Sequence, residues 1–315
     1  MANHWTTSDM HTLQGNLTLV TGANSGIGLQ TALELARNGA HVLLGCRTLS
    51  KGAAAADTIR RQVPGATVDP VLLNLASLAS IRSFAAAFLA GGRSLDMLIN
   101  NAGVMAFAER RTSPDGFELQ LATNHLGHFA LTGLLMPALL AAPAPRIVTI
   151  ASIAHKTGRI HFDDLQLEHS YHPWTAYRQS KLANLLFALE LDRRARALHS
   201  KLLSVAAHPG LARTGIIANG PGGQQLGYRL YGLLSGLLAQ SDIDGALPTL
   251  YAATDPSMKG GEYIGPAGWF EFKGPPTRVQ PSAYALDSAA ARKLWAISEQ
   301  LTGVICSLEA ASRRD

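Results

Sequence analysis

Two residues that can take part in proton transfer stand four positions apart in the segment YRQSK, Tyr177 and Lys181. The surrounding residues have the apolar spacing of an amphipathic helix, and on a helix positions i and i+4 lie one above the other. The Lys181 ammonium can therefore sit beside the Tyr177 hydroxyl, as a catalytic pair would require. The same geometry occurs on plain solvated helix faces, so this pair indicates catalysis only if the rest of the chain supplies partners.

A glycine-rich turn is the first such partner. The segment TGANSGIG, residues 21–28, follows an apolar run and precedes a helical pattern. Gly22 would make the turn, Gly26 would admit phosphates and Gly28 would let the helix pack against the sheet. The helix N-terminus offers free N–H groups and the positive end of its dipole, so the turn predicts a dinucleotide site.

The end of the next apolar run favours NADP(H) over NAD(H). An NAD-binding protein typically has an acidic residue there to bind the ribose hydroxyls, but this chain has Cys46, followed by Arg47 and Lys51. Cations suit a 2′-phosphate, and Arg can bind it through two hydrogen bonds. The alternative is that Arg47 is a solvated loop arginine.

The elements that position these residues alternate along the chain. Short apolar runs at 17–22, 41–46, 67–74, 95–100, 146–152 and 202–210 predict strands, and the segments between them have helical spacing. Continuous apolar strands separated by helices predict one α/β domain over residues 1–315. It would be a Rossmann-type, doubly wound parallel sheet with strand order 3-2-1-4-5-6-7 and helices on both faces. Pro70 suits an edge strand, which the third strand is in this order; alternatively, Pro70 only starts a shorter strand.

Composition excludes several other classes of protein. The 315 residues are 47% hydrophobic, and the net charge of +5 is scattered, which does not favour nucleic acid binding. Two cysteines and no long apolar run predict a cytoplasmic protein without a transmembrane segment. The histidines and acids between residues 155 and 172 lack the spacing of a metal site, so we expect no metal.

Taken together, TGANSGIG, NNAG at 100–103, Ser152 and YRQSK resemble the short-chain dehydrogenase/reductase family. The segments GCR at 45–47, TNHLGHF at 123–129, ASIAH at 151–155 and AYRQSKLANLLF at 176–187 are similar to its retinol-dehydrogenase-like, NADP(H)-using branch.

This resemblance implies a catalytic tetrad of Asn124, Ser152, Tyr177 and Lys181. A free phenol has a pKa of about 10, which a neighbouring ammonium and a positive nicotinamide lower toward the working range. Tyr177 would then exchange a proton with the substrate oxygen, which Ser152 would hold in place. Lys181 would also bind the nicotinamide ribose, and Asn124 would join it through water in a proton relay. The alternatives are that Ser152 only ends a strand and that Asn124 satisfies backbone groups at a helix irregularity.

The glycine turn, the local charge and the resemblance together assign a set of cofactor-binding residues. It comprises Gly22, Asn24, Ser25, Gly26, Ile27, Gly28, Arg47, Lys51, Asn74, Leu75, Asn101, Ala102, Gly103, Tyr177, Lys181, Pro209, Gly210, Leu211 and Thr214. One departure is Asn74, where the family commonly has Asp; it keeps a carbonyl acceptor for adenine but loses the charge.

Three segments are expected on the substrate side or at the C-terminus: an insertion at about 155–174, a lid at about 211–240 and a helical extension at about 285–315. The predicted substrate pocket contains Met105, Phe107, Ser152, Trp174, Tyr177 and Leu211. Met105 and Phe107, together with an apolar face of the lid, predict a small hydrophobic ketone or aldehyde interconverted with its alcohol; the face consists of Leu226, Leu230, Leu233, Leu234 and Leu237. The same apolar spacing is also compatible with core burial alone, or with contact with a partner or a membrane surface. The alternatives are an NADP-binding sensor or scaffold with little turnover, and a reductase of C=C bonds. The helices near 117–141 and 175–199, where family members often pair, leave both homodimer and monomer open, because the C-terminal helix could cap that surface instead.

Overall fold

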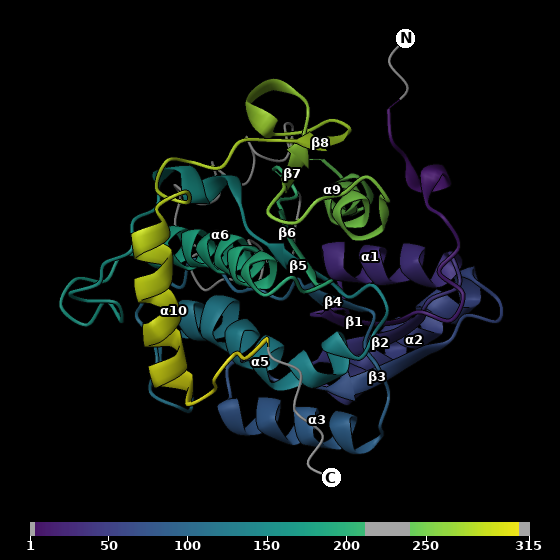
Figure 1. The fold of residues 1–315 in the computed structure, drawn as a ribbon, viewed down its shortest axis with the longest axis horizontal. Helices are drawn as coiled ribbons and strands as arrows, with labels where there is room; N and C mark the ends of the chain where they lie inside the picture. The colour runs from purple at the N-terminus through teal and green to yellow at the C-terminus, as the bar shows by residue number, and fades with distance from the viewer. Residues whose placement is uncertain (1–3, 212–239, 309–315) are drawn as a thin grey trace.

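The computed structural model describes residues 4–211 and 240–308, and within them one sheet carries helices on both faces (Figure 1). The strand order is β3-β2-β1-β4-β5-β6-β7-β8. The strands are β1 Leu17–Thr21, β2 His41–Cys46, β3 Val68–Leu72, β4 Met97–Asn100, β5 Arg146–Ile150, β6 Leu203–Ala207, β7 Tyr263–Pro266 and β8 Pro276–Arg278. The predicted doubly wound parallel sheet is confirmed, and all six apolar runs contain strands.

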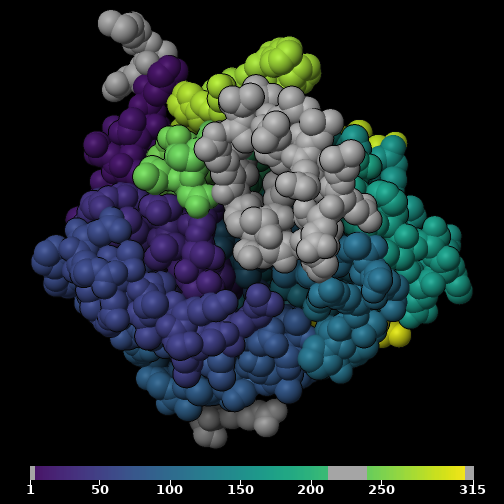
Figure 2. Space-filling model, turned by 180° about the vertical axis from the view of Figure 1, so that it is seen from behind, coloured from purple at the N-terminus to yellow at the C-terminus, as the bar shows by residue number. Residues whose placement is uncertain are grey.

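Helices cover the sheet in two layers (Figure 1). The longer helices are α1 Gly26–Arg37, α2 Leu49–Gln62, α3 Leu78–Ala90, α5 Gly127–Leu140, α6 Pro173–Ala197, α9 Asp242–Thr254 and α10 Ser288–Thr302. Helices α1 and α9 pack side by side on one face, in purple and green in Figure 2. Helices α3, α5 and α6 lie on the other. None of the helices in the described ranges has the length and apolar character needed to cross a membrane.

Alternation along the strands divides the core between the two faces. Leu19, Leu43 and Leu98 join the cluster that contains Phe129 of α5. Their neighbours, such as Val20, belong to the cluster on the α1 face. Because both faces are buried, each strand is apolar throughout, which is why the strands could be recognised as continuous apolar runs.

Strand β3 forms one edge of the sheet, where Pro70 stands opposite Leu44 of β2. A proline lacks the N–H that a central strand would need, so its edge position agrees with the prediction. At the other edge the sequence missed a strand, because β8 pairs antiparallel with β7, with Ile264 opposite Arg278. The short β8 contains Pro276 and has no apolar run to indicate it.

The helix expected near 117–141 is not continuous. A short helix α4, Leu119–Leu121, leads into a π-helical turn, Ala122–Leu126, before α5 begins at Gly127. A side chain at Gly127 would overlap the Leu75 carbonyl oxygen, so the chain after β3 approaches this turn closely. The π turn carries Asn124 inward, where it is fully buried. Such turns are frequent at functional sites.

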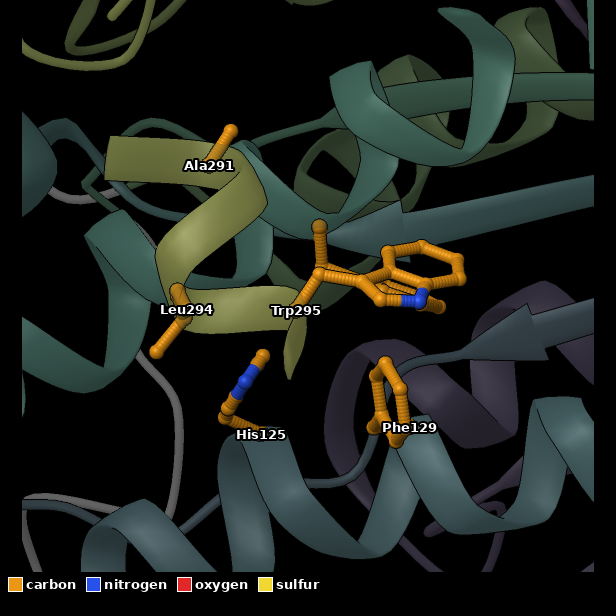
Figure 3. Close-up of a pocket in the computed structure, with 6 residues that line it drawn as sticks. His125, Phe129, Ala291, Leu294 and Trp295 are labelled. Carbon is orange, nitrogen blue, oxygen red and sulfur yellow. The ribbon is translucent and has the colours of Figure 1, made fainter. Parts of the chain in front are cut away.

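Helix α10 packs on α6 and α5, the surface that the sequence left open for pairing. Its Trp295 ring lies 5.1 Å from Phe129 and 5.8 Å from Phe187 between ring centroids. Figure 3 shows Trp295 and Leu294 facing His125 and Phe129 across a small apolar pocket too narrow for a water molecule. None of the predicted substrate-pocket residues lines it, so it is a packing gap under α10.

Candidate active site

Tyr177 and Lys181 lie one turn apart on α6, near the end of β5. Lys181 Nζ is 6.0 Å from the centre of the Tyr177 ring and donates a 3.0 Å hydrogen bond to the Ile150 carbonyl oxygen. Asn184 Nδ2 donates to the same oxygen at 3.0 Å. Burial lowers the pKa of Lys181 to about 8, so its ammonium stays charged at neutral pH. The structure therefore holds a desolvated cation beside the phenol.

Ser152 comes two residues after Ile150 and caps the short helix η3, Ile153–Thr157. Its Oγ accepts from the Ala154 N–H at 3.2 Å, and its carbonyl oxygen accepts from His155 Nδ1 at 2.7 Å. The end of β5 thus presents Ser152 while its last residue binds Lys181. Two members of the predicted tetrad are positioned by the same strand.

Asn124 joins the chain after β4 to α6. Its Oδ1 accepts from the Val104 N–H at 2.8 Å, and its Nδ2 donates to the Val104 carbonyl at 3.0 Å and to Ser180 Oγ at 2.9 Å. Ser180 Oγ donates onward to the Tyr177 carbonyl oxygen at 2.8 Å. A Cβ built on Gly103 would lie 3.4 Å from Asn124 Oδ1 and 3.5 Å from Lys181 Nζ, so all three meet at one point. Ser180 lies inside YRQSK, but its spacing gave no sign of this contact.

A buried histidine that the sequence did not single out connects this point to the glycine turn. His128 Nδ1 donates to the Asn124 carbonyl oxygen at 2.8 Å, which fixes the tautomer and leaves Nε2 to accept from Thr21 Oγ1 at 2.9 Å. The Thr21 oxygen in turn accepts the N–H groups of Asn101 and Ala102, each at 2.9 Å. Burial lowers the pKa of His128 to about 4, so the ring is neutral across the physiological range. The network fixes the ends of β1 and β4 relative to the π turn.

The glycine turn has the shape that a pyrophosphate needs. Gly22 and Gly26 adopt positive φ angles of 66° and 58°, and among the described residues a Cβ on Gly26 would meet only Asp242 Oδ2, at 3.9 Å. A Cβ on Gly28 would lie 2.5 Å from the Gly22 carbonyl oxygen, so only glycine permits this close approach. The Ser25 side chain makes no capping hydrogen bond to α1, which leaves the N–H groups of the first turn available to an anion. The residues present fit a dinucleotide phosphate.

Beyond the turn, the end of β2 presents a neutral thiol and two cations. Cys46 is buried, and this burial raises the pKa of its thiol to about 11, although its sulfur receives a hydrogen bond from the Ala23 N–H. Arg47 and Lys51 are exposed and form no ion pair with any residue of 4–211 or 240–308. The position expected for a ribose-binding carboxylate is thus uncharged, with free cations next to it.

The residues predicted on the adenine side follow β3 and β4. Asn74 Oδ1 already accepts from the Ala76 N–H at 3.2 Å, which leaves one lone pair for a ligand. Leu75 is buried. Asn101 Nδ2 donates to the Thr21 carbonyl at 2.7 Å, so this side chain braces the turn from within.

On the substrate side, half-buried Met105 and Phe107 flank Ala106, whose φ of 52° is unusual for a residue with a side chain. Tyr171 anchors the predicted insertion, because its hydroxyl donates to the Phe107 carbonyl oxygen at 2.9 Å. The Trp174 ring lies edge-on to Tyr177, 6.0 Å between centroids. Residues 158–172 contain neither helix nor strand.

The loop after β6 presents Pro209, Gly210 and Leu211, all half-buried. The Leu211 carbonyl oxygen accepts from the Gln240 N–H at 2.8 Å. Residues 211 and 240, which are far apart in the chain, therefore lie side by side. Thr214 and the remainder of the segment expected at 211–240 lie outside the described residues.

A dinucleotide turn joined to a Tyr–Lys pair at the carboxyl ends of parallel strands defines a nicotinamide-dependent oxidoreductase. The family model for short chain dehydrogenase matches residues 16–219, and the chain belongs to that family. It falls in the retinol-dehydrogenase-like part of it: retinol dehydrogenase 13 of Homo sapiens is 42% identical over 308 residues, which cover 96% of this chain and 88% of the relative.

Two solved structures are similar to this chain over most of its length. An uncharacterized protein from Mycobacterium Paratuberculosis is 42% identical with a TM-score of 0.81, covering 97% of this chain and 100% of the other. A short chain dehydrogenase from Escherichia coli CFT073, complexed with NADPH, is 25% identical with a TM-score of 0.61, covering 80% and 96%.

Proposed function

We propose that this protein is an NADP(H)-dependent oxidoreductase that interconverts a hydrophobic ketone or aldehyde with its alcohol, with Tyr177 as the general acid and base. The observation that carries the proposal is the buried Lys181 ammonium one helical turn from Tyr177, with a pKa lowered by burial to about 8. A cation in a site of low dielectric stabilises tyrosinate strongly, which makes the phenol a usable acid near neutral pH.

In the direction of reduction, a bound nicotinamide cofactor would supply hydride for the carbonyl carbon, and the protein's own residues handle the oxygen and its proton. Ser152 donates a hydrogen bond to the carbonyl oxygen and fixes its angle to the hydride donor. Tyr177 gives its proton to that oxygen as negative charge develops on it, and Lys181 stabilises the resulting tyrosinate. Asn124 and Ser180 hold the Tyr177 turn of α6 against the chain after β4, and in oxidation Tyr177 takes the alcohol proton instead.

The preference for NADP(H) over NAD(H) is supported by charge at the end of β2. Arg47 and Lys51 are exposed cations, and the neighbouring Cys46 thiol is neutral because burial raises its pKa to about 11. A carboxylate in the place of Cys46 would repel a 2′-phosphate, whereas Arg47 can bind it.

An apolar substrate is supported by the side chains around Tyr177. Trp174 packs against Tyr177, Met105 and Phe107 follow Gly103 in the chain, and all three are half-buried. The relative at 42% identity is named for retinol, an apolar alcohol. Cofactor oxidation should therefore be followed by nicotinamide absorbance with a panel of apolar aldehydes and ketones that includes retinal.

The Tyr177→Phe variant provides the decisive comparison. It should lose at least about a hundredfold in kcat, the usual contribution of a positioned acid, and bind NADPH nearly as well as the parent. The control is Tyr284→Phe, which alters a tyrosine that packs against Arg159. Retained activity in Tyr177→Phe would exclude the phenol as the acid. NADPH binding without turnover of any carbonyl would favour a sensor or scaffold, and a saturated product from an enone would favour a C=C reductase.

A further inference from the structure

The loop between β7 and β8, residues 267–275, has an unusual backbone. Phe270 and Glu271 both adopt positive φ angles, 50° and 60°. Residues with side chains rarely occupy this region, and two in succession persist only where the surrounding contacts require it. Contacts of the Glu271 side chain hold the backbone in this conformation.

The Glu271 carboxylate lies between the Lys156 ammonium and the His208 ring. Oε1 accepts from Lys156 Nζ at 2.7 Å, and Oε2 lies 3.1 Å from His208 Nε2. Burial raises the pKa of Glu271, but the His208 ring and the hydrogen-bonded Lys156 ammonium beside the carboxylate outweigh it and hold that pKa at about 2. The side chain is therefore ionised throughout the working range while it is 20% exposed.

His208 carries this contact to the loop after β6. Its ring is fully buried, and Nδ1 accepts from the Gly210 N–H at 3.2 Å, which places the ring proton on Nε2, facing Glu271. A side chain at Gly265 would overlap His208 Nε2, so strand β7 leaves room for the ring. The Leu211 N–H donates to the Phe272 carbonyl at 2.8 Å. The 267–275 loop thus holds residues 208–211 through both side chain and backbone.

Lys156 connects Glu271 to the turn that begins at Ser152. Lys156 belongs to η3, and its neighbour His155 donates from Nδ1 to the Ser152 carbonyl oxygen at 2.7 Å. The Ser282 N–H donates to His155 Nε2 at 3.2 Å, so both nitrogens of the His155 ring are hydrogen-bonded. The Tyr263 ring contacts both histidine rings, at 5.3 Å from His155 and 5.2 Å from His208 between centroids.

We propose that Glu271 is a positioning residue that sets the Ser152 turn relative to the Pro209–Leu211 loop. This rests on the proposed function, in which Ser152 holds the substrate oxygen, and on the sequence prediction that Pro209, Gly210 and Leu211 bind the cofactor. Transfer between two bound groups depends on their mutual placement to within a fraction of an ångström. One carboxylate oxygen of Glu271 contacts Lys156 beside the Ser152 turn, and the other faces His208 at the start of the loop after β6. The charge of Glu271 therefore couples these two segments.

The test is Glu271→Gln in the full chain. The neutral amide keeps the size of the side chain, but it removes the negative charge that attracts Lys156 and faces His208 Nε2. We expect kcat per folded molecule to fall about tenfold with NADPH affinity changed by less than about threefold, because misplacement slows transfer while the phosphate contacts persist. Glu262→Gln is the matched control, since Glu262 pairs with Arg278 at 2.7 Å and is 21% exposed.

Two further measurements separate this inference from the proposed function. Hydrogen exchange of the Gly210 and Leu211 amides should accelerate in Glu271→Gln and not in Glu262→Gln, whether or not a carbonyl substrate is found. Lys156→Gln should slow turnover as well, and the double variant should be little worse than Glu271→Gln, because both changes break one bridge. Unchanged exchange at both amides would overturn the bridge, and faster exchange with unchanged kcat would overturn its part in positioning.

Discussion

Replacing Lys181 with methionine tests whether the ammonium is desolvated in the folded protein. Methionine keeps the length and apolar stem of the side chain and removes the charge that contacts the Ile150 carbonyl. In the folded chain burial lowers the pKa of Lys181 from 10.5 to about 8. Between these values the folded protein has released a proton that the unfolded chain still holds.

The sign and size of the pH effect follow from that difference. Below pH 8 Lys181 is protonated in both states, and folding bears the full penalty of burying the charge. As the pH rises the folded state loses its proton first, so the penalty is relieved and stability increases. With pKa values of 8 and 10.5, the free energy of unfolding of the parent should rise relative to Lys181→Met by about 1.3 kcal/mol between pH 7 and 9.

The assay is urea unfolding of both proteins without cofactor at several pH values from 7 to 9. Burial raises the pKa of the Cys46 and Cys306 thiols to about 11 and 12, and both residues are present in parent and variant, so their effects cancel in the difference. A difference in unfolding free energy that stays constant with pH would show that the ammonium is solvated, and the account of Tyr177 activation given above would fail.

Three further predictions concern the cofactor site and its support. Arg47→Ala should weaken NADPH binding about tenfold to a hundredfold, the value of a charged hydrogen bond, and leave NADH nearly unaffected, with Arg61→Ala as control; equal losses for both cofactors in titrations would contradict a 2′-phosphate contact. His128→Phe should lower the urea unfolding free energy by about 1–3 kcal/mol, because the Asn124 carbonyl loses the ring N–H, whereas the Thr21 hydroxyl keeps the Ile99 carbonyl at 3.2 Å as an acceptor; a loss below about 0.5 kcal/mol would mean that the network is dispensable. Gly28→Ala should weaken nucleotide binding and stability together, since its Cβ would lie 2.5 Å from the Gly22 carbonyl oxygen, and wild-type behaviour in both would show that the turn can relax.

The sequence predicted the sheet well because its pattern is local. Each central strand is buried on both faces, so β2 shows consecutive apolar residues, Val42–Leu44, whatever lies next to it. Pro70 also agreed with its edge position. The sequence missed β8, because that strand is three residues long and depends on pairing with β7 rather than on a pattern of its own.

Within the candidate site, the predicted tetrad and the glycine turn came from motifs, which consist of residue types at fixed spacings. The residues that support them did not. His128, Ser180 and Glu271 have no distinguishing pattern, and their partners Thr21, Asn124 and Lys156 come from other elements.

The sequence by itself therefore determined the fold class and the order of the central strands, and it indicated which side chains have the chemistry to exchange a proton or bind a dinucleotide. These properties reside in single residues and in spacings of a few positions. Only the tertiary structure decided the environment of those side chains. It buried Lys181 and lowered its pKa, set Asn124 in a π turn, and placed Glu271 between Lys156 and His208. Burial and electrostatic coupling depend on neighbours brought together from distant parts of the chain, so no short stretch of sequence can specify them.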